Sequence, residues 1–410
     1  MVEEVRTPVE PLSPEDLDDA RELLRGNAVV TPIQTSRWLT DLVGAPVVMK
    51  CENLQRTGSF KARGAYVRIA RLPDEQRAKG VVAASAGNHA QGVALAARTL
   101  GIHATVFMPE GAPIPKENAT RGYGADVVFE GQYVDQCLDG ARAYSERTGA
   151  VLIHPFDHPD IVAGQGTLGL EVLDQVPDVR TIVVPLGGGG LLAGVALAVK
   201  QRRPDVTVVG VQAEEAAAYP PSLAAGEPVQ LDSMPTMADG IAVGRPGDVN
   251  FPLIRRYVDE IRTVSEESIS RALLALVERA KLVVEPAGVV GVAAVLDEPG
   301  SFQGPVAVVL SGGNIDPLLL GKVIGHGMAA AGRYLPLSVT IPDRPGSLAR
   351  MLAEIGELGA NVVEVVHGRT NPALRLDEVE VKLQLETRGE PHAQKVLERL
   401  RSKGYAAVGP

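Results

Sequence analysis

The chain has 410 residues, which exceeds what one hydrophobic core usually supports, so two or three domains are expected. Hydrophobic residues make up 45% of the sequence and charged residues 22%, a balance that is typical of a folded globular protein and excludes a disordered one. The formal net charge of −10 disfavours nucleic acid and anionic membranes as main partners, because both bind clustered positive charge, and it leaves small molecules.

Residues 14–310 predict strands that alternate with helices. Ser13 and Pro14 are typical of a helix cap and a first helical position, and this helix is expected to extend to about residue 25. Val-rich runs follow, most of them without polar alternation, as in strands that are covered on both faces. These predicted strands are 47–51, 81–85, 104–108, 126–130, 151–155, 181–185, 206–211 and 306–310. With helical patterns between them, they predict an α/β fold: a doubly wound, mostly parallel sheet in two lobes.

The sequence shows no pattern of a secretion signal or of a membrane span. The amino terminus is acidic and lacks the basic and then apolar order of a signal peptide. Residues 182–199 are uncharged, but Pro185 and the glycines at 187–190 favour a strand, a turn and a helix over a span. Cys51 and Cys137 have no metal-ligand spacing, so neither a disulfide framework nor a zinc site is indicated. We therefore expect a cytoplasmic protein without a membrane partner.

The pattern changes near residue 333. The following segments predict a strand, a helix, two strands and a helix, at 335–342, 347–359, 361–368, 378–387 and 392–404. Apolar and polar residues alternate cleanly in the first and third of these strands, which predicts a sheet with one solvated face. The sequence therefore predicts a separate ferredoxin-like domain at residues 333–410, after a first domain at residues 1–332.

A lysine lies at the start of a predicted helix, within the sequence SFKARG at residues 59–64. Lys61 is flanked by Phe60 and Ala62, although lysines normally lie on hydrated surfaces. One interpretation is a side chain whose stem covers apolar surface while its ammonium group reaches water. The other is an amine that burial keeps neutral, so that it can form a Schiff base. Lys61 by itself does not decide between these interpretations.

Three glycine-bearing stretches, at 85–92, 185–194 and 311–314, directly follow predicted strands. In a doubly wound sheet, the turns at the carboxyl ends of strands meet in one crevice. The four consecutive glycines at 187–190 leave N–H groups accessible before a helix, whose amino end carries partial positive charge, and this favours a phosphate. The alternative is a tight turn that needs positive φ angles, for which two glycines would suffice.

The spacing of these glycines narrows the choice of cofactor. It is neither GxGxxG followed by an acidic residue nor GxxxxGK[ST], so neither a dinucleotide nor a nucleoside triphosphate is indicated. A cofactor that carries a phosphate and bonds to a lysine remains. Pyridoxal phosphate meets both requirements.

The sequence resembles the fold-type II pyridoxal-phosphate enzymes and, among them, the threonine ammonia-lyases, also called threonine dehydratases. The resemblance covers nearly all of residues 15–330 and runs through the motifs SFKARG, SAGNHAQG, GGGGLLAG, TMADGIAV, EPAG and SGGN. It implies a tryptophan synthase β-like fold and deamination of L-threonine, and of L-serine, by elimination of water. The implied products are 2-oxobutanoate, or pyruvate, and ammonia.

The resemblance also implies roles for single residues. Lys61 would form the Schiff base with the cofactor and, once displaced by substrate, remove its α-proton. The implied cofactor-binding residues are Lys61, Phe60, Asn88, Gly187, Gly188, Gly189, Gly190, Leu191 and Ser311. The Ser311 hydroxyl would face the pyridine nitrogen and leave it uncharged. The substrate carboxylate would bind the backbone amides of Ser85, Ala86, Gly87, Asn88 and His89.

Some positions differ from relatives of this family. Serine racemases carry a serine two residues before the cofactor-contacting asparagine, as a second base, whereas Ala86 here cannot transfer a proton. Glu214 matches the first acidic residue of a related divalent-metal site, but Pro220 stands where the second acidic residue is expected, so no metal is assigned.

The remaining polar residues receive other interpretations. Arg63 is expected to anchor its helix through a salt bridge and not to bind substrate. Asp239 and Gly240 are expected to shape the wall of the cleft. For Glu285, orientation of the cofactor or of the entering substrate and capping of a helix both remain open. For the histidines at 89, 154 and 158, structural roles are favoured over catalysis.

The carboxyl-terminal domain resembles an ACT domain, a regulatory module that binds amino acids. The matching segments are IPDRPGSL at 341–348 and GANVVEV at 359–365. They imply an effector site at Asp343, Gly346 and Asn361, a branched-chain amino acid as effector, and a homodimer or homotetramer. A non-catalytic amino-acid sensor, or another β-eliminating enzyme of the same fold, remains as an alternative function.

Overall fold

The structure is a computed structural model that describes residues 12–369 and 374–409. The chain divides into two compact units, Met1–Asp316 and Pro317–Pro410. The helix at 317–330 belongs to the second unit, although the sequence-based division at residue 332 includes it in the first. The assignment of a catalytic and a regulatory domain stays a prediction.

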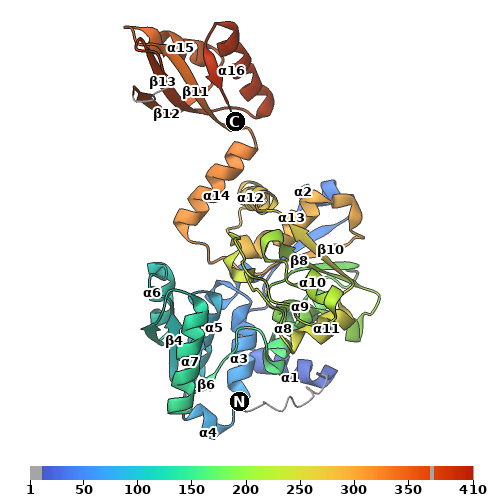
Figure 1. Cartoon of the computed structure of the whole chain (residues 1–410). Helices are drawn as coiled ribbons and strands as arrows, with labels where there is room; N and C mark the ends of the chain where they lie inside the picture. The colour runs from blue at the N-terminus through green and yellow to red at the C-terminus, as the bar shows by residue number, and fades with distance from the viewer. Residues whose placement is uncertain (1–11, 370–373, 410) are drawn as a thin grey trace. The chain divides into compact units, whose positions relative to one another are not determined.

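The first unit contains ten strands and most of the helices among its described residues (Figure 1). The strands are β1 (Ile33–Thr35), β2 (Val47–Cys51), β3 (Val81–Ala84), β4 (Ala104–Met108), β5 (Asp126–Phe129), β6 (Val151–Leu152), β7 (Thr181–Pro185), β8 (Thr207–Ala213), β9 (Glu260–Val264) and β10 (Val306–Leu310). The α-helices are α1 (Pro14–Leu24), α2 (Arg37–Val43), α3 (Lys61–Ala70), α4 (Asp74–Arg77), α5 (Asn88–Leu100), α6 (Ile114–Gly122), α7 (Val134–Thr148), α8 (Pro159–Gln175), α9 (Gly190–Arg202), α10 (Tyr219–Ala225), α11 (Asn250–Tyr257), α12 (Glu266–Ala275) and α13 (Pro286–Asp297). Short helical turns are η1 (Glu52–Leu54), η2 (Arg56–Gly58), η3 (Glu214–Ala216), η4 (Asp239–Ile241), the π-helix η5 (Leu276–Ala280) and η6 (Pro299–Ser301).

These strands form two separate sheets, which confirms the predicted two-lobed α/β fold. The larger sheet has the order β1-β2-β10-β7-β8-β9, with only β1 antiparallel to its neighbour. The smaller sheet has the order β5-β4-β3-β6 and is parallel throughout. In Figure 1 the smaller sheet lies with α5, α6 and α7 in one lobe of the unit. Parallel strands joined by crossover helices explain the order of strands and helices in the sequence.

Burial of the strands follows their place in the sheets. The central strands β2, β7 and β10 are buried along their whole length, as their continuous apolar runs predict. Strand β5 does not follow this expectation, because it lies at the edge of the smaller sheet and has three exposed residues out of four. Each lobe has its own apolar core, one around β7 and α9 and the other around β3 and α5.

Helix α3 joins the two lobes, because it packs against α5 of the smaller one and against α8. Close contact between α3 and α8 depends on two glycines. A Cβ atom on Gly64 would lie 3.0 Å from the Ile161 carbonyl oxygen, and one on Gly164 would lie 2.6 Å from the Gly64 Cα. This contact fixes the position of Lys61, the first residue of α3.

The second unit has the strand and helix order that the sequence predicts for residues 333–410, plus one further strand. Its elements are α14 (Pro317–Ala330), β11 (Tyr334–Pro342), α15 (Ser347–Glu357), β12 (Asn361–Gly368), β13 (Glu378–Glu386), α16 (Glu390–Ser402) and β14 (Ala406–Val408). The sheet has the antiparallel order β12-β13-β11-β14, which is the ferredoxin-like arrangement. Buried and accessible residues alternate along β11 and β13, so the predicted one-sided sheet is confirmed there.

Residues 182–199 form most of β7, a glycine turn and most of α9, as predicted. Within residues 12–369 and 374–409, no helix is long and apolar enough to span a membrane. Cys51 and Cys137 are both buried and unpaired with each other.

Candidate active site

A cavity of about 990 Å³ lies in the first unit, where the ends of β3, β7 and β10 meet the start of α3. Strand β3 belongs to the smaller sheet and the other two strands to the larger one, so the cavity lies between the lobes. The three glycine-bearing stretches line it, although they are far apart in the sequence. Its lining includes every residue predicted for cofactor or substrate binding: Phe60, Lys61, Ser85, Ala86, Gly87, Asn88, His89, Gly187, Gly188, Gly189, Gly190, Leu191 and Ser311.

The Lys61 amine faces this cavity. Its Nζ donates a hydrogen bond of 2.8 Å to the carbonyl oxygen of Pro155 and lies 5.3 Å from the centre of the Phe60 ring. Burial lowers the pKa of the Lys61 amine to about 8, although the negative charge of Glu285 acts in the opposite direction. A neutral amine is therefore accessible near neutral pH, which an ordinary surface lysine does not provide.

The glycine turn, residues 187–190, exposes a row of backbone donors. The N–H groups of residues 187–191 have no acceptor among the described residues. They lie at and just before the amino end of α9, where the helix dipole adds positive potential. Glycine is required here for space as well, because a Cβ atom on Gly188 would lie 2.5 Å from the Phe156 ring. The turn therefore offers a site for an anion of the size of a phosphate.

A second set of donors lies at the start of α5. The N–H group of Ser85 donates to the Phe107 carbonyl at 3.0 Å, and that of Gly87 donates to Ser85 Oγ at 3.1 Å. The N–H groups of Ala86, Asn88 and His89 have no acceptor among the described residues. Three of the five backbone donors that were predicted for a carboxylate thus remain accessible.

The side chain of Asn88 is held at both ends. Its Nδ2 donates to Glu285 Oε1 at 2.7 Å, and its Oδ1 accepts from Asn314 Nδ2 at 2.8 Å. Asn314 Nδ2 also donates to the Thr57 carbonyl at 2.6 Å. These contacts determine the positions of the amide nitrogen and the amide oxygen of Asn88. Sequence reasoning did not assign Asn314 a role, although it is the last residue of the SGGN motif.

Glu285 precedes the first turn of α13 and is almost completely buried. Burial raises the pKa of its carboxyl group to about 7, with a further contribution from Asp239, whereas the hydrogen bond from Asn88 lowers it. A side chain on Gly312 would overlap Glu285 Oε1, so the glycine makes room for this carboxyl group. The Glu285 side chain makes no capping hydrogen bond at the start of α13 but contacts Asn88, and this favours the predicted orienting role over the capping role.

Ser311 follows β10 and is buried, with 2% of its surface exposed. Its carbonyl oxygen accepts a hydrogen bond of 3.1 Å from the Phe60 N–H group, which ties this turn to the residue before Lys61. The SGGN stretch contains no charged residue. The group that Ser311 can offer to a ring nitrogen is its hydroxyl, which is neutral.

The histidines near the site are held in structural contacts. His89 Nε2 donates to the Ile153 carbonyl at 2.8 Å, and burial lowers the pKa of His89 to about 3. His154 Nδ1 accepts from the Asp157 N–H group at 2.8 Å. His158 Nδ1 accepts from the Asp160 N–H group at 3.1 Å and caps α8. One ring nitrogen of each histidine is therefore engaged in a contact within the protein, which agrees with the structural roles that the sequence favoured.

An ion pair spans the rim of the cavity. Lys116 from α6 and Asp239 from η4 line the cavity from opposite lobes, and their side chains pair at 3.0 Å. Gly240 also lines it. The wall role that the sequence suggested for residues 239 and 240 is consistent with these positions.

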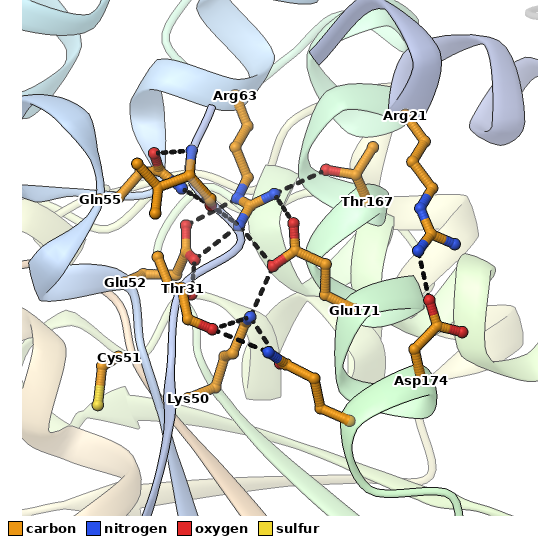
Figure 2. A network of polar contacts seen from close by, with 12 residues as sticks. Arg21, Thr31, Lys50, Cys51, Glu52, Gln55, Arg63, Thr167, Glu171 and Asp174 are labelled. Atoms are coloured by element: carbon orange, nitrogen blue, oxygen red, sulfur yellow. Dashed lines mark hydrogen bonds and ion pairs between the residues drawn. The ribbon is translucent and has the colours of Figure 1, made fainter. Parts of the chain in front are cut away.

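Arg63 lies on the far side of α3 in a buried charge network, defined here as Arg63, Glu52, Glu171 and Lys50 (Figure 2). Its guanidinium group pairs with Glu52 at 2.8 Å and with Glu171 at 2.7 Å, and Lys50 Nζ pairs with Glu171 at 2.6 Å. The predicted anchoring role of Arg63 is confirmed, but the sequence did not indicate two carboxylates or a second buried cation.

Comparison with known proteins identifies the family. Residues 24–312 match the family described as pyridoxal-phosphate dependent enzyme. This chain belongs to the pyridoxal-phosphate dependent enzymes. The match spans every motif that lines the cavity except the last residue pair of the SGGN stretch.

The relatives of this pyridoxal-phosphate dependent enzyme include full-length matches. It is 46% identical to an L-threonine ammonia-lyase of Thermotoga maritima over 391 residues, which cover 95% of this chain and 98% of the relative. It is 47% identical to an L-threonine ammonia-lyase of Geobacter sulfurreducens over 95% of this chain and 97% of that protein. Among solved structures, a threonine deaminase of T.th. has a TM-score of 0.71 and 45% identity, covering 74% of this chain and 99% of its own. Maize serine racemase has a TM-score of 0.73 and 36% identity, covering 78% and 98%.

The residues of this pyridoxal-phosphate dependent enzyme fit its cofactor. The cofactor needs an amine for its aldehyde and donors for its phosphate, and the cavity supplies Lys61 and the five accessible N–H groups of residues 187–191. Among the residues that the structure describes, no group of three or more His, Cys, Asp or Glu side chains is placed to hold a metal ion. Glu214 and Pro220 lie in η3 and α10, and a metal stays unassigned.

Proposed function

We propose that this chain deaminates L-threonine, and L-serine, by eliminating water, and that it releases 2-oxobutanoate or pyruvate together with ammonia. The observation that carries the proposal is the Lys61 amine, whose pKa is lowered and which shares one cavity with two sets of accessible backbone donors. The two relatives named L-threonine ammonia-lyase support the choice of substrate, since they match 95% of this chain.

The residues of the cavity have separate roles in this reaction. Lys61, residues 187–191, Asn88 and Ser311 would hold the cofactor, which when bound withdraws electrons from the α-carbon of the substrate. The N–H groups of Ala86, Asn88 and His89 bind the substrate carboxylate. Lys61 Nζ removes the α-proton as a general base, and the β-hydroxyl group leaves as water after it takes up a proton, which the proton now held by Lys61 balances. The enamine that results takes up water and yields the 2-oxo acid and ammonia, with no net oxidation.

A substrate series tests this function. Purified enzyme should form 2-oxo acid from L-threonine and L-serine and none from amino acids without a β-leaving group. A 2-oxo acid assay with L-threonine, L-serine, O-acetyl-L-serine and L-alanine measures this. Turnover of O-acetyl-L-serine alone would instead support another β-eliminating enzyme of this fold, and no product from any of them would support a non-catalytic sensor. D-serine should not form from L-serine, because Ala86 carries no proton-transferring group.

The pH dependence of cofactor attachment follows from the pKa of Lys61. An amine attacks an aldehyde only in its neutral form, and burial has moved the pKa down from 10.5 to about 8. Capture of pyridoxal phosphate by the apoenzyme should therefore accelerate as the pH rises toward 8 and level off above about 9. Stopped-flow absorbance measures this rate. A rate that continues to rise up to pH 10.5 would show an ordinary lysine and contradict the assignment.

We further propose that the second unit is an ACT domain that binds a branched-chain amino acid at Asp343, Gly346 and Asn361, and that the enzyme is a cytoplasmic homodimer or homotetramer. The ferredoxin-like sheet order supports the domain type. Gly346 has φ +83° directly before α15, and no side chain caps the start of this helix. Asp343 already forms a two-fold contact with Arg369, at 2.9 and 3.1 Å.

Effector binding tests this second proposal. Calorimetric titration of the full-length enzyme with isoleucine and with valine should show saturable binding. Asp343→Asn should weaken it, because the variant loses the charge that organises Arg369. Alanine serves as the control ligand. If none of these amino acids binds, the second unit has no such effector site.

A further inference from the structure

The carbonyl group of Gly188, in the middle of the glycine turn, accepts three hydrogen bonds. The donors are the Gly247 N–H group at 3.1 Å, Asn250 Nδ2 at 3.0 Å and the Tyr219 hydroxyl at 3.3 Å. Asn250 and Tyr219 are both completely buried and are the first residues of α11 and α10. A carbonyl oxygen has two lone pairs, so three donors are more than this group needs to complete its hydrogen bonds.

The orientation of the Gly188 carbonyl group determines the direction in which the next N–H group, that of Gly189, points. The peptide unit is planar and trans, so the Gly188 carbonyl and the Gly189 N–H point in opposite directions. The three donors hold the carbonyl on the protein side of the turn. The Gly189 N–H therefore points away from them, and it has no acceptor among the described residues. Gly189 lines the cavity, so this donor is available to a ligand there.

The same peptide is in a conformation that only glycine adopts readily. Gly189 has φ +105°, and a Cβ atom there would overlap the Tyr219 hydroxyl and lie 2.9 Å from Asn250 Cβ. The two side chains thus pack directly against the turn whose donor they direct. Without them, the peptide between Gly188 and Gly189 would be free to rotate and turn its carbonyl oxygen toward the anion.

Asn250 also joins the turn to the segment that holds Lys61. Its Nδ2 donates to the Phe156 carbonyl at 3.1 Å as well as to Gly188, while its Oδ1 is buried without a partner among the described residues. The adjacent Pro155 carbonyl accepts from Lys61 Nζ. A buried amide oxygen without a hydrogen bond lowers the stability of the fold. The side chain of Asn250 nevertheless keeps this orientation, in which Nδ2 donates to both carbonyl groups.

We propose that Asn250 and Tyr219 are positioning residues for the cofactor phosphate: by holding the Gly188 carbonyl, they direct the Gly189 N–H group to the phosphate. Burial raises the pKa of the Tyr219 hydroxyl, so it stays a neutral donor throughout the working pH range. The proposal rests on the cofactor of the family and not on the proposed substrate, and its test needs no turnover.

The experiment compares two cofactor forms on full-length apoenzyme. Pyridoxal phosphate and pyridoxal are titrated into wild type, Asn250→Asp and Tyr219→Phe, with absorbance as the readout. Asn250→Asp replaces two donors by carboxylate oxygens against two carbonyls, and should weaken pyridoxal phosphate binding by about 100-fold. Tyr219→Phe removes one neutral hydrogen bond and should weaken it by about 3- to 10-fold. Neither variant should change pyridoxal binding by more than about 2-fold, because pyridoxal carries no phosphate.

Tyr144→Phe is the matched control. Its hydroxyl accepts from Thr105 in the smaller lobe and is not part of the cavity lining, so both ligands should bind as in wild type. Tyr219→Phe keeps the ring and carries the test even if Asn250→Asp unfolds. Equal losses of affinity for both ligands would reduce the two residues to a general packing role and overturn the proposal. Unchanged pyridoxal phosphate binding in Tyr219→Phe and Asn250→Asp would overturn it as well.

Discussion

Lys61→Ala should abolish deamination, with a loss of at least about 1,000-fold in kcat, because the variant lacks both the group that bonds to the cofactor and the proposed base. Lys61 is the first residue of α3 and lines the cavity, and alanine is a good helix former, so the fold should persist. Steady-state 2-oxo acid formation and the absorbance of the bound cofactor measure the two effects.

The control for this variant is an exposed lysine. Lys395→Ala, on α16 of the second unit, should keep both the activity and the absorbance of wild type. Thermal unfolding of Lys61→Ala shows whether the protein is folded. A folded Lys61→Ala enzyme with near-normal turnover would remove Lys61 from the mechanism.

Arg63→Met should destabilise the protein by about 3–5 kcal/mol, because it leaves Glu52 and Glu171 buried without their shared cation. In wild type, burial works against ionisation of Glu52, but Arg63 holds the pKa of this carboxyl group below its ordinary value. Without Arg63, burial raises the pKa, and protonation at low pH relieves part of the penalty. The loss of unfolding free energy in Arg63→Met, relative to wild type, should therefore be larger at pH 8 than at pH 5.5.

Urea unfolding of the first unit measures this prediction, and Figure 2 contains its control. Arg21 and Asp174 form an ion pair on the surface near the buried charge network, with about half of each side chain exposed. Arg21→Met should change the urea midpoint little, since exposed pairs contribute little. If Arg63→Met were as mild as Arg21→Met at pH 8, the network would not stabilise the position of α3.

Much of the fold was predictable because the sheets are parallel and covered. Short, mostly apolar runs identify β2, β4, β7 and β10 with their observed bounds. The sequence missed β1, β9 and β14, which have only three to five residues with few buried positions. The run at 151–155 gives only the two residues of β6, because the chain then turns to place Pro155 against Lys61. Short edge strands are set by their neighbours more than by their own pattern.

The site was predictable where it consists of turns after strands, since these carry glycine motifs. For the glycine turn, the sequence analysis treated a phosphate site and a tight turn as alternatives. The structure has features of both, because Gly189 has a positive φ angle and the turn also exposes a row of N–H donors. Asn250, Tyr219 and Glu171 escaped prediction. Each is a single polar residue outside any motif, and only the tertiary structure shows its contacts.

The central claim is that the nitrogen at position 61 bonds to pyridoxal phosphate. Reduction of the purified holoenzyme with borohydride, followed by proteolysis and mass spectrometry, tests it most directly. We predict one phosphopyridoxyl-modified peptide, modified at Lys61. Modification at another lysine, or none in protein that contains the cofactor, would contradict the assignment of this cavity as the active site.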